Sequence, residues 1–197
     1  MTTTLTALYD TREAALGAVR DLKVVGLEDT DMSLIASGDP APAMPQGDGD
    51  VLVEAGAGAA VGAGVGGTGG LLAGLGLITI PGIGPVLAAG WLATAAAGAV
   101  AGAAVGGAAG GLIGALVADG VGEDDAHLYA EAVRRGGTLV IARVPNLRLE
   151  AARTVLDARR AVDPATRRAA YRDEGWTGFD PDAPRPAPRD TRPDRPV

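Results

Sequence analysis

The chain has 197 residues, with 17 lysines and arginines against 24 aspartates and glutamates, giving a net charge of −7. It contains no cysteine and one histidine, which excludes a disulfide framework, thiolate chemistry and a histidine-based metal cluster within one chain. The acidic excess lies wholly in residues 1–54, so no basic surface for nucleic acid is expected. We predict no catalytic residue, no metal site, no cofactor and no nucleic-acid partner.

Residues 1–38 have the pattern of a strand, a helix and a second strand. The segment Thr4–Tyr9 alternates between polar and apolar residues as a strand does. Asp10 is the expected cap of a helix that ends near Gly26, with Glu13 in the capping-box position. Residues 32–36 are apolar enough for the second strand, and 39–54 are expected to form an acidic linker.

The segment 55–118 has no charged residue, and glycine recurs there at every fourth position in two series. Residues four apart lie on one face of a helix, so each series predicts a glycine stripe along a helix, over about 55–78 and 86–118. The two series mirror each other about Val86, which predicts an antiparallel glycine-zipper helical hairpin. The helix-packing residues are Gly58, Gly62, Gly66, Gly70, Gly74, Gly98, Gly102, Gly106, Gly110 and Gly114.

The centre of this segment carries a strong turn signal in Pro81, Gly82, Gly84 and Pro85. Each predicted helix is long enough to cross a hydrocarbon core of about 30 Å, and small residues at this spacing allow close helix packing in lipid. The bulkiest apolar residues gather beside the turn. Alanine and glycine are barely hydrophobic, however, so a hairpin buried in an oligomer in water is the alternative.

Residues 62–67 satisfy the pattern G-x-G-x-x-G, which occurs in dinucleotide-binding folds. That function needs a strand before the pattern and an acidic residue about twenty positions after it. The next acidic residue here is Asp119, so the match reflects glycine density and predicts no nucleotide site.

Residues 119–163 repeat the order of the first unit. A helix is predicted over 123–135, a strand over 138–144, and a helix from Asn146 to about Arg160. A very short candidate strand follows at 161–163. The two halves together predict an α+β, ferredoxin-like domain (βαβ + αβαβ) with the hairpin inserted between them.

The remaining residues are expected mainly on the surface and in the C-terminal tail. The segment 164–180 is expected to form a helix and an aromatic docking segment with Trp176 and Phe179. Residues 181–197 are rich in proline, arginine and aspartate and predict a disordered tail. We expect His127 and the pair Arg134–Arg135 on solvated faces. The acidic residues 119 and 123–125 could form a cation patch, although complementing a helix N-terminus is the favoured interpretation.

This order of elements resembles the bacterial general stress proteins, also described as heat- or low-temperature-induced. The resemblance covers roughly residues 3–163, and its most specific part is 79–90, with the sequence TIPGIGPVLAAG. It extends to the exit segment Gly110–Leu116 and the run Arg135–Val140. The resemblance implies a stress-induced protein with no established catalytic residues.

Two functions follow from these observations. The first is a non-enzymatic stress-response protein whose hairpin enters the lipid bilayer of the cytoplasmic membrane, with residues 1–54 and 119–197 on the cytoplasmic side. The second is a soluble, cytoplasmic regulatory or small-ligand-binding module whose hairpin drives self-assembly. Both functions predict a homo-oligomer. The N-terminal segment has neither a basic region nor a long apolar run, so no secretory signal is expected.

Overall fold

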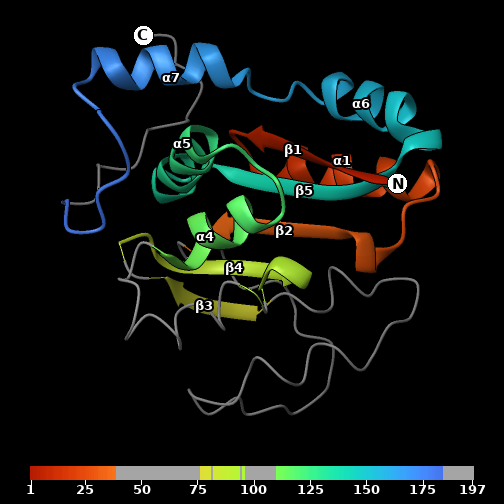
Figure 1. Ribbon diagram of the computed structural model, residues 1–197, viewed down its shortest axis with the longest axis horizontal. Coiled ribbons are helices and arrows are strands. Elements are labelled where there is room, and N and C mark those ends of the chain that lie inside the picture. Colours follow the sequence, from red (N-terminus) through yellow and green to blue (C-terminus); the bar gives the residue numbers. More distant parts are fainter. Residues whose placement is uncertain (39–75, 81, 94, 96–109, 184–197) are drawn as a thin grey trace, which may run out of the picture.

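The computed structural model describes residues 1–38, 76–80, 82–93, 95 and 110–183, which form a mixed α/β structure around one antiparallel sheet (Figure 1). The strand order is β1-β5-β2-β4-β3. The elements in chain order are β1 (Thr2–Tyr9), α1 (Arg12–Val24), β2 (Met32–Ser37), β3 (Gly76–Ile80), β4 (Gly84–Gly90), α4 (Gly110–Ala118), α5 (Glu123–Arg134), β5 (Thr138–Pro145), α6 (Leu149–Ala158) and α7 (Pro164–Asp173). Short 3-10 turns precede β2 and α6, at Asp29–Asp31 and Asn146–Arg148.

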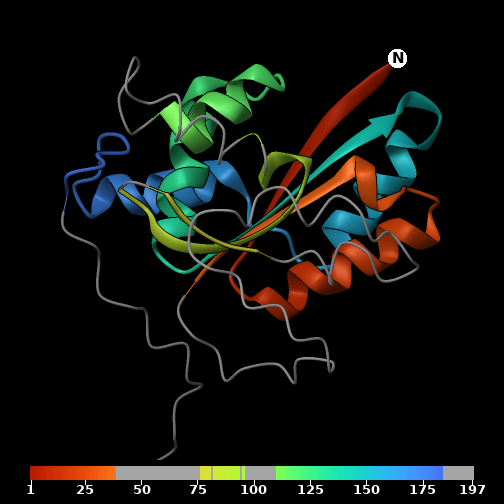
Figure 2. The same cartoon turned by 90° about the horizontal axis from the view of Figure 1, so that it is seen from below.

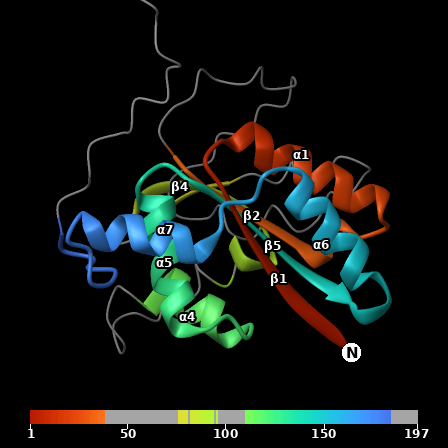
Figure 3. The same cartoon turned by 90° about the horizontal axis from the view of Figure 1, so that it is seen from above.

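Both faces of the sheet are covered by helices, as Figures 2 and 3 show. Successive strand residues point to opposite faces, so the strands contribute to two separate cores. Tyr9 and Leu34 pack with α1 and α6, whereas Leu8 and Ile35 pack with α4 and α5. The central strands are therefore buried on both sides, which explains their nearly continuous apolar sequence.

The first helix begins one residue later than expected. Thr11 is the cap of α1, and its hydroxyl oxygen accepts a hydrogen bond from the backbone N–H of Ala14 at 3.3 Å. The expected cap at Asp10 is therefore wrong by one position, and Asp10 instead forms an ion pair with Arg167 at 2.6 Å. The helix ends as predicted near Gly26, which has a positive φ of 91°.

The two predicted helices of the hairpin are wrong at 76–78 and 86–90, because β3 and β4 occupy these residues. Both strands form an antiparallel β-hairpin whose register runs from Gly76 opposite Ala88 to Ile80 opposite Gly84. That register centres on Gly82 rather than Val86. A helix does occur at the end of the charge-free segment, where α4 covers Gly110–Ala118.

The hairpin belongs to the sheet because β4 pairs along β2, from Ser33 opposite Gly90 to Ser37 opposite Val86. Gly90 lies so close to β2 that a Cβ built there would be 2.1 Å from the carbonyl oxygen of Met32. The hydroxyl of Ser33 also accepts a hydrogen bond from the N–H of Leu92 at 3.0 Å. The end of β4 is thus fixed against β2 by backbone and side-chain contacts.

Two of the bulky apolar residues expected at a membrane-inserted tip, Ile80 and Leu92, lie instead in the core of the domain. Ile80 and Ile83 are 2% and 3% exposed, and Val86 and Leu92 are fully buried. They pack in one cluster with Leu112, Leu116 and the apolar residues of α5. Among the residues that the structure describes, no helix has the length and apolarity required to span a membrane.

Replacing Leu92 with alanine is expected to lower the free energy of unfolding by about 2–5 kcal/mol, because a fully buried leucine leaves a cavity. Chemical unfolding of the purified protein without detergent measures this loss. Leu147, which is fully exposed, is the matched control, and its alanine variant should unfold like the parent protein. Equal stability of both variants would contradict the burial of Leu92.

The segment after α7 lies against α5 and the β3–β4 turn. Phe179 is buried, and Trp176 packs edge-to-face on Tyr171 with ring centroids 6.0 Å apart. The backbone N–H of Phe179 donates to Nδ1 of His127 at 3.3 Å. His127 is therefore only partly exposed and helps to hold this segment, which corrects its expected place on a solvated face.

Arg134 is also buried, so its expected place on a solvated face is wrong. Its guanidinium donates to the carbonyl oxygens of Asp180 at 2.8 Å and Ala183 at 3.3 Å. On its other side it pairs with Glu131 at 2.5 Å. Arg134 thus attaches the C-terminal segment to α5.

Candidate functional site

The predicted packing glycines lie mostly outside the described residues. Residues 58–74 and 98–106 of the two series are not described, whereas Gly110 and Gly114 belong to α4. Gly114 is exposed, and no described heavy atom lies within 4 Å of a Cβ built there. Among the described residues, the stripe therefore has no close helix contact at Gly114.

Of the predicted turn residues, Gly82 and Gly84 lie at the tip of the β3–β4 hairpin, Pro85 lies in β4 opposite Thr79, and Pro81 lies outside the described residues. Gly82 and Gly84 have positive φ values of 77° and 94°, which favour glycine. A Cβ at Gly82 would also be 2.4 Å from Cα of Pro181. These glycines allow a tight β-turn and the close approach of the C-terminal segment, and their role is structural.

The feature best suited to binding is the outer edge of β1, the end strand of the sheet. The carbonyl of Met1 accepts from the N–H of Asn146 beside β5, whereas the carbonyl of Leu8 accepts from the N–H of Val162 on the other side. Because strand residues alternate in direction, Thr2, Thr4 and Thr6 also direct their N–H and C=O groups outward. Within the described residues, the bridge between Leu8 and Val162 is the only backbone pairing on the outer edge of β1.

The sequence after α6 explains why this edge stays open. Val162 pairs with Leu8, but Pro164 has no N–H to continue the ladder. Asp163 instead caps α7 by accepting a hydrogen bond from the N–H of Thr166 at 2.7 Å, and Pro164 occupies the first turn of that helix. The candidate strand at 161–163 is thus reduced to one bridge, and the chain leaves the sheet.

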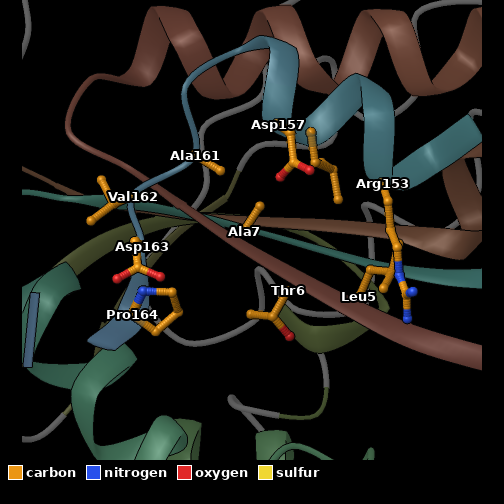
Figure 4. Close-up of a pocket in the computed structure, with 10 residues that line it drawn as sticks. Leu5, Thr6, Ala7, Arg153, Asp157, Ala161, Val162, Asp163 and Pro164 are labelled. Atoms are coloured by element: carbon orange, nitrogen blue, oxygen red, sulfur yellow. The ribbon is translucent and has the colours of Figure 1, made fainter. Parts of the chain in front are cut away.

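A pocket of about 260 Å³ lies between this edge and α6 (Figure 4). Its apolar lining comes from β1 and the inner side of α6, whereas its charged groups are Arg153, Asp157 and Asp163. Figure 4 shows Arg153 and Asp157 descending from α6 and Asp163 on the opposite wall. The remaining lining residues are Leu5, Thr6, Ala7, Leu156, Ala161, Val162 and Pro164. The pocket can therefore accept an apolar group beside a backbone edge, with charges of both signs at its rim.

Two hydrogen bonds shape the walls of this pocket. The hydroxyl of Tyr9 donates to the carbonyl oxygen of Leu156 at 3.1 Å and fixes α6 against the sheet. Burial raises the pKa of Tyr9, so the hydroxyl remains protonated at neutral pH. Hydrogen bonding from Thr166 lowers the pKa of Asp163, so its carboxylate remains charged.

Replacing Asp163 with asparagine is expected to flatten the acid limb of the stability curve. Asparagine still caps the helix, but it does not titrate. The folded-state pKa of Asp163 lies below its ordinary value of 3.8, so its contribution is present above that value and is lost as pH falls through the folded pKa. Unfolding curves from about pH 5 to about pH 2 should fall less steeply for the variant than for the parent. Parallel curves would contradict this role of Asp163.

The other charged cluster near β1 is structural. The guanidinium of Arg143 lies 3.6 Å from the ring centroid of Trp91 and donates to Asp119 at 2.8 Å. Asp119 also accepts from the hydroxyl of Thr4 at 2.8 Å. No group of acidic and histidine residues among the described part of the chain is arranged to hold a metal ion. Asp119 and Asp125, which were candidates for a cation patch, form ion pairs with Arg143 and Arg168.

Sequence reasoning did not identify the pocket residues Arg153, Asp157 and Asp163. One signal pointed toward them, because a strand as short as 161–163 cannot cover β1. The adjacent Asp163–Pro164 pair is also a helix-start signal, and it predicts the end of strand pairing.

Comparisons with known proteins found no matching protein family, no similar curated protein and no similar solved structure. The resemblance to general stress proteins therefore stays a prediction.

Proposed function

We propose that the protein is a non-enzymatic binding and assembly module built on a ferredoxin-like domain. The order β1-β5-β2, its antiparallel pairing and the bridge from Val162 to the outer side of β1 support this fold. In this interpretation α1 and α6 are the crossover helices on one face. The β3–β4 hairpin, α4 and α5 are then an insertion that extends the sheet and covers its other face.

The observation that carries this function is the burial of Ile80, Val86 and Leu92, in and beside the β3–β4 hairpin, within the domain itself. Val86 and Leu92 are fully buried against α4 and α5, so they are not available to contact lipid. Beyond β4, the charge-free residues Leu112 and Leu116 of α4 belong to the same buried cluster. This packing favours self-assembly over a hairpin with two membrane crossings.

We assign a role in self-assembly to the charge-free glycine and alanine residues that flank the β3–β4 hairpin. Glycine costs about 1 kcal/mol relative to alanine in a helix, so its regular spacing requires close packing as compensation. A role in the stress response remains part of the proposal only because residues 79–90 resemble the general stress proteins. No reaction is assigned to the pocket beside β1, which we regard as a binding site.

Washing membranes from expressing cells with alkaline carbonate tests this function. We expect the protein in the supernatant and, after purification without detergent, a molar mass above that of the 19.5 kDa chain by light scattering. Protein that stays in the membrane pellet would overturn the proposal in favour of the lipid-inserted alternative.

Replacing Gly66 with leucine is expected to reduce the assembled mass, because a large side chain would separate backbones that pack closely. The matched control is leucine at Ala63, which lies off the glycine stripe in the predicted helix. Both positions lie outside the described residues, so the test rests on the spacing of the sequence. Equal assembly of both variants would show that the stripe does not drive self-association.

A further inference from the structure

We propose that the open edge of β1 is an interface for a second copy of this chain, joined by antiparallel pairing of the two β1 strands around Thr4. The two sheets would then form one continuous sheet across a twofold axis. This surface differs from the glycine-rich segment, so the inference goes beyond the proposed function.

Among the described residues, the edge from Thr2 to Ala7 has none of the features that usually prevent strand pairing. Proteins protect edge strands with charges, prolines, bulges or covering segments. From Met1 to Tyr9 this strand has no charged residue, no proline and no glycine. Its eight residues from Thr2 to Tyr9 pair continuously with β5, while the outer side is bridged at Leu8. A long, uncharged strand with free outward N–H and C=O groups is a template for another strand.

The position of Val162 limits the register of that second strand. Because Leu8 already pairs with Val162, the incoming strand must end by the position opposite Ala7. Outward groups belong to the even-numbered residues, so hydrogen-bonded pairs join even positions. When Thr4 of one copy lies opposite Thr4 of the other, Thr2 of each copy pairs with Thr6 of the other copy. Leu8 then keeps its pairing with Val162. If the second strand were shifted by two residues toward Leu8, its Thr2 would occupy the position of Val162. If it were shifted by two residues in the other direction, Thr6 would have no partner.

The side chains in this register are self-complementary. Thr2, Thr4 and Thr6 share one face of the strand, so the seam consists of threonine pairs, which stabilise antiparallel strands. The opposite face carries Leu5 and Ala7, which line the pocket. The second copy therefore meets threonines on one face and the apolar side of the pocket on the other.

Polar and charged groups also lie next to the edge. The hydroxyl of Thr3 donates to the side chain of Asn146 at 3.2 Å, so the 3-10 turn before α6 lies beside the beginning of β1. Arg153 and Asp157 line the pocket together with Leu5 and Ala7, so charges of both signs lie next to the seam. The twofold axis at Thr4 places Thr3 of one copy opposite Leu5 of the other.

Cysteine cross-linking tests this interface directly, because the natural chain contains no cysteine. Opposite residues in a hydrogen-bonded antiparallel pair have Cα atoms about 5.5 Å apart, within the range that a disulfide bridges. Under mild oxidation, the Thr4→Cys variant should become mostly disulfide-linked dimer on a non-reducing gel. Loss of the hydroxyl contact with Asp119 should be tolerated, since Arg143 still holds that carboxylate. The thermal transition of the reduced variant verifies that it folds.

The matched controls are Thr2→Cys and Thr6→Cys, which carry the same group on the same face of the strand. Each is about 14 Å along the strand from its own copy, too far for a disulfide. Neither single variant should cross-link alone, whereas a mixture of the two should give mixed dimers. A folded Thr4→Cys variant that remains monomeric, or equal cross-linking of all three variants, would overturn the interface. A protein that assembles without cross-linking at Thr4 would leave the proposed function intact, so the two failures are distinguishable.

Discussion

Replacing Glu131 with alanine is expected to lower the free energy of unfolding by about 3–5 kcal/mol, because it leaves two arginines without their shared carboxylate. Glu131 is fully buried and lies 2.5 Å from both Arg134 and Arg135. The Arg134 side chain is itself only 4% exposed, so water cannot compensate for the lost partner. Urea unfolding followed by circular dichroism measures the change.

The matched control is Glu150→Ala, which removes a glutamate from an exposed ion pair with Arg153. Exposed pairs of this kind contribute about 1 kcal/mol or less. The Glu131 variant should also release the segment around Phe179, because Arg134 holds the carbonyl oxygens of Asp180 and Ala183. Tryptophan fluorescence of Trp176 in the folded state reports that release. Similar stability losses in the two variants would contradict the buried network.

Two glycines of the charge-free segment are expected to respond to alanine in opposite directions. Gly90 has a φ of 86°, and a Cβ there would be 2.1 Å from the carbonyl oxygen of Met32. The left-handed backbone costs about 1–2 kcal/mol for alanine, and the overpacking adds about 1–3 kcal/mol. Thermal unfolding of the Gly90→Ala variant should reveal a large loss of stability.

The Gly114→Ala variant should be at least as stable as the parent and can gain up to about 1 kcal/mol. Gly114 lies in α4, is exposed, and has open space among the described residues where a Cβ would be placed. A strong loss of stability at Gly114 would show that the glycine stripe makes a close contact there. The pair of variants therefore separates a glycine required by the sheet from one that is not.

The strands and helices on either side of the charge-free segment could be predicted from local patterns. The alternation of residues 4–9 and the apolar run 138–144 correspond to β1 and β5. The helix stop at Gly136 also has a local cause, because its φ of 100° favours glycine. These elements depend on interactions between near neighbours in sequence, which a single sequence records.

The β3–β4 hairpin could not be predicted in the same way. The glycine series on either side of the hairpin match a helical period, and the alternation that defines a strand is confined to a few residues around Ile78 and Ile80. What decides the outcome is pairing of β4 with β2, from Ser33 to Ser37, which lies far away in sequence. Tertiary pairing of this kind overrides a local period.

The candidate site shows the same division. The Asp163–Pro164 pair is a local signal that the last strand ends early, and Asp163 does cap α7. The contact of Arg153 and Asp157 with β1 depends on how α6 lies on the sheet. No spacing within the sequence reports that arrangement, so the pocket required the fold. The early end of the last strand could be anticipated from the sequence, but the position of Arg153, Asp157 and Asp163 at the rim of the pocket could not.

Amide hydrogen exchange in detergent-free solution tests the central claim, that the charge-free segment contributes strands to the core of the domain. We predict that peptides covering Gly84–Gly90 are protected as strongly as those covering Thr138–Pro145, because β4 and β5 both pair with β2. Rapid exchange throughout 84–90, beside strong protection of 138–145, would contradict the account. Protection that arises only after lipid vesicles are added would do so as well.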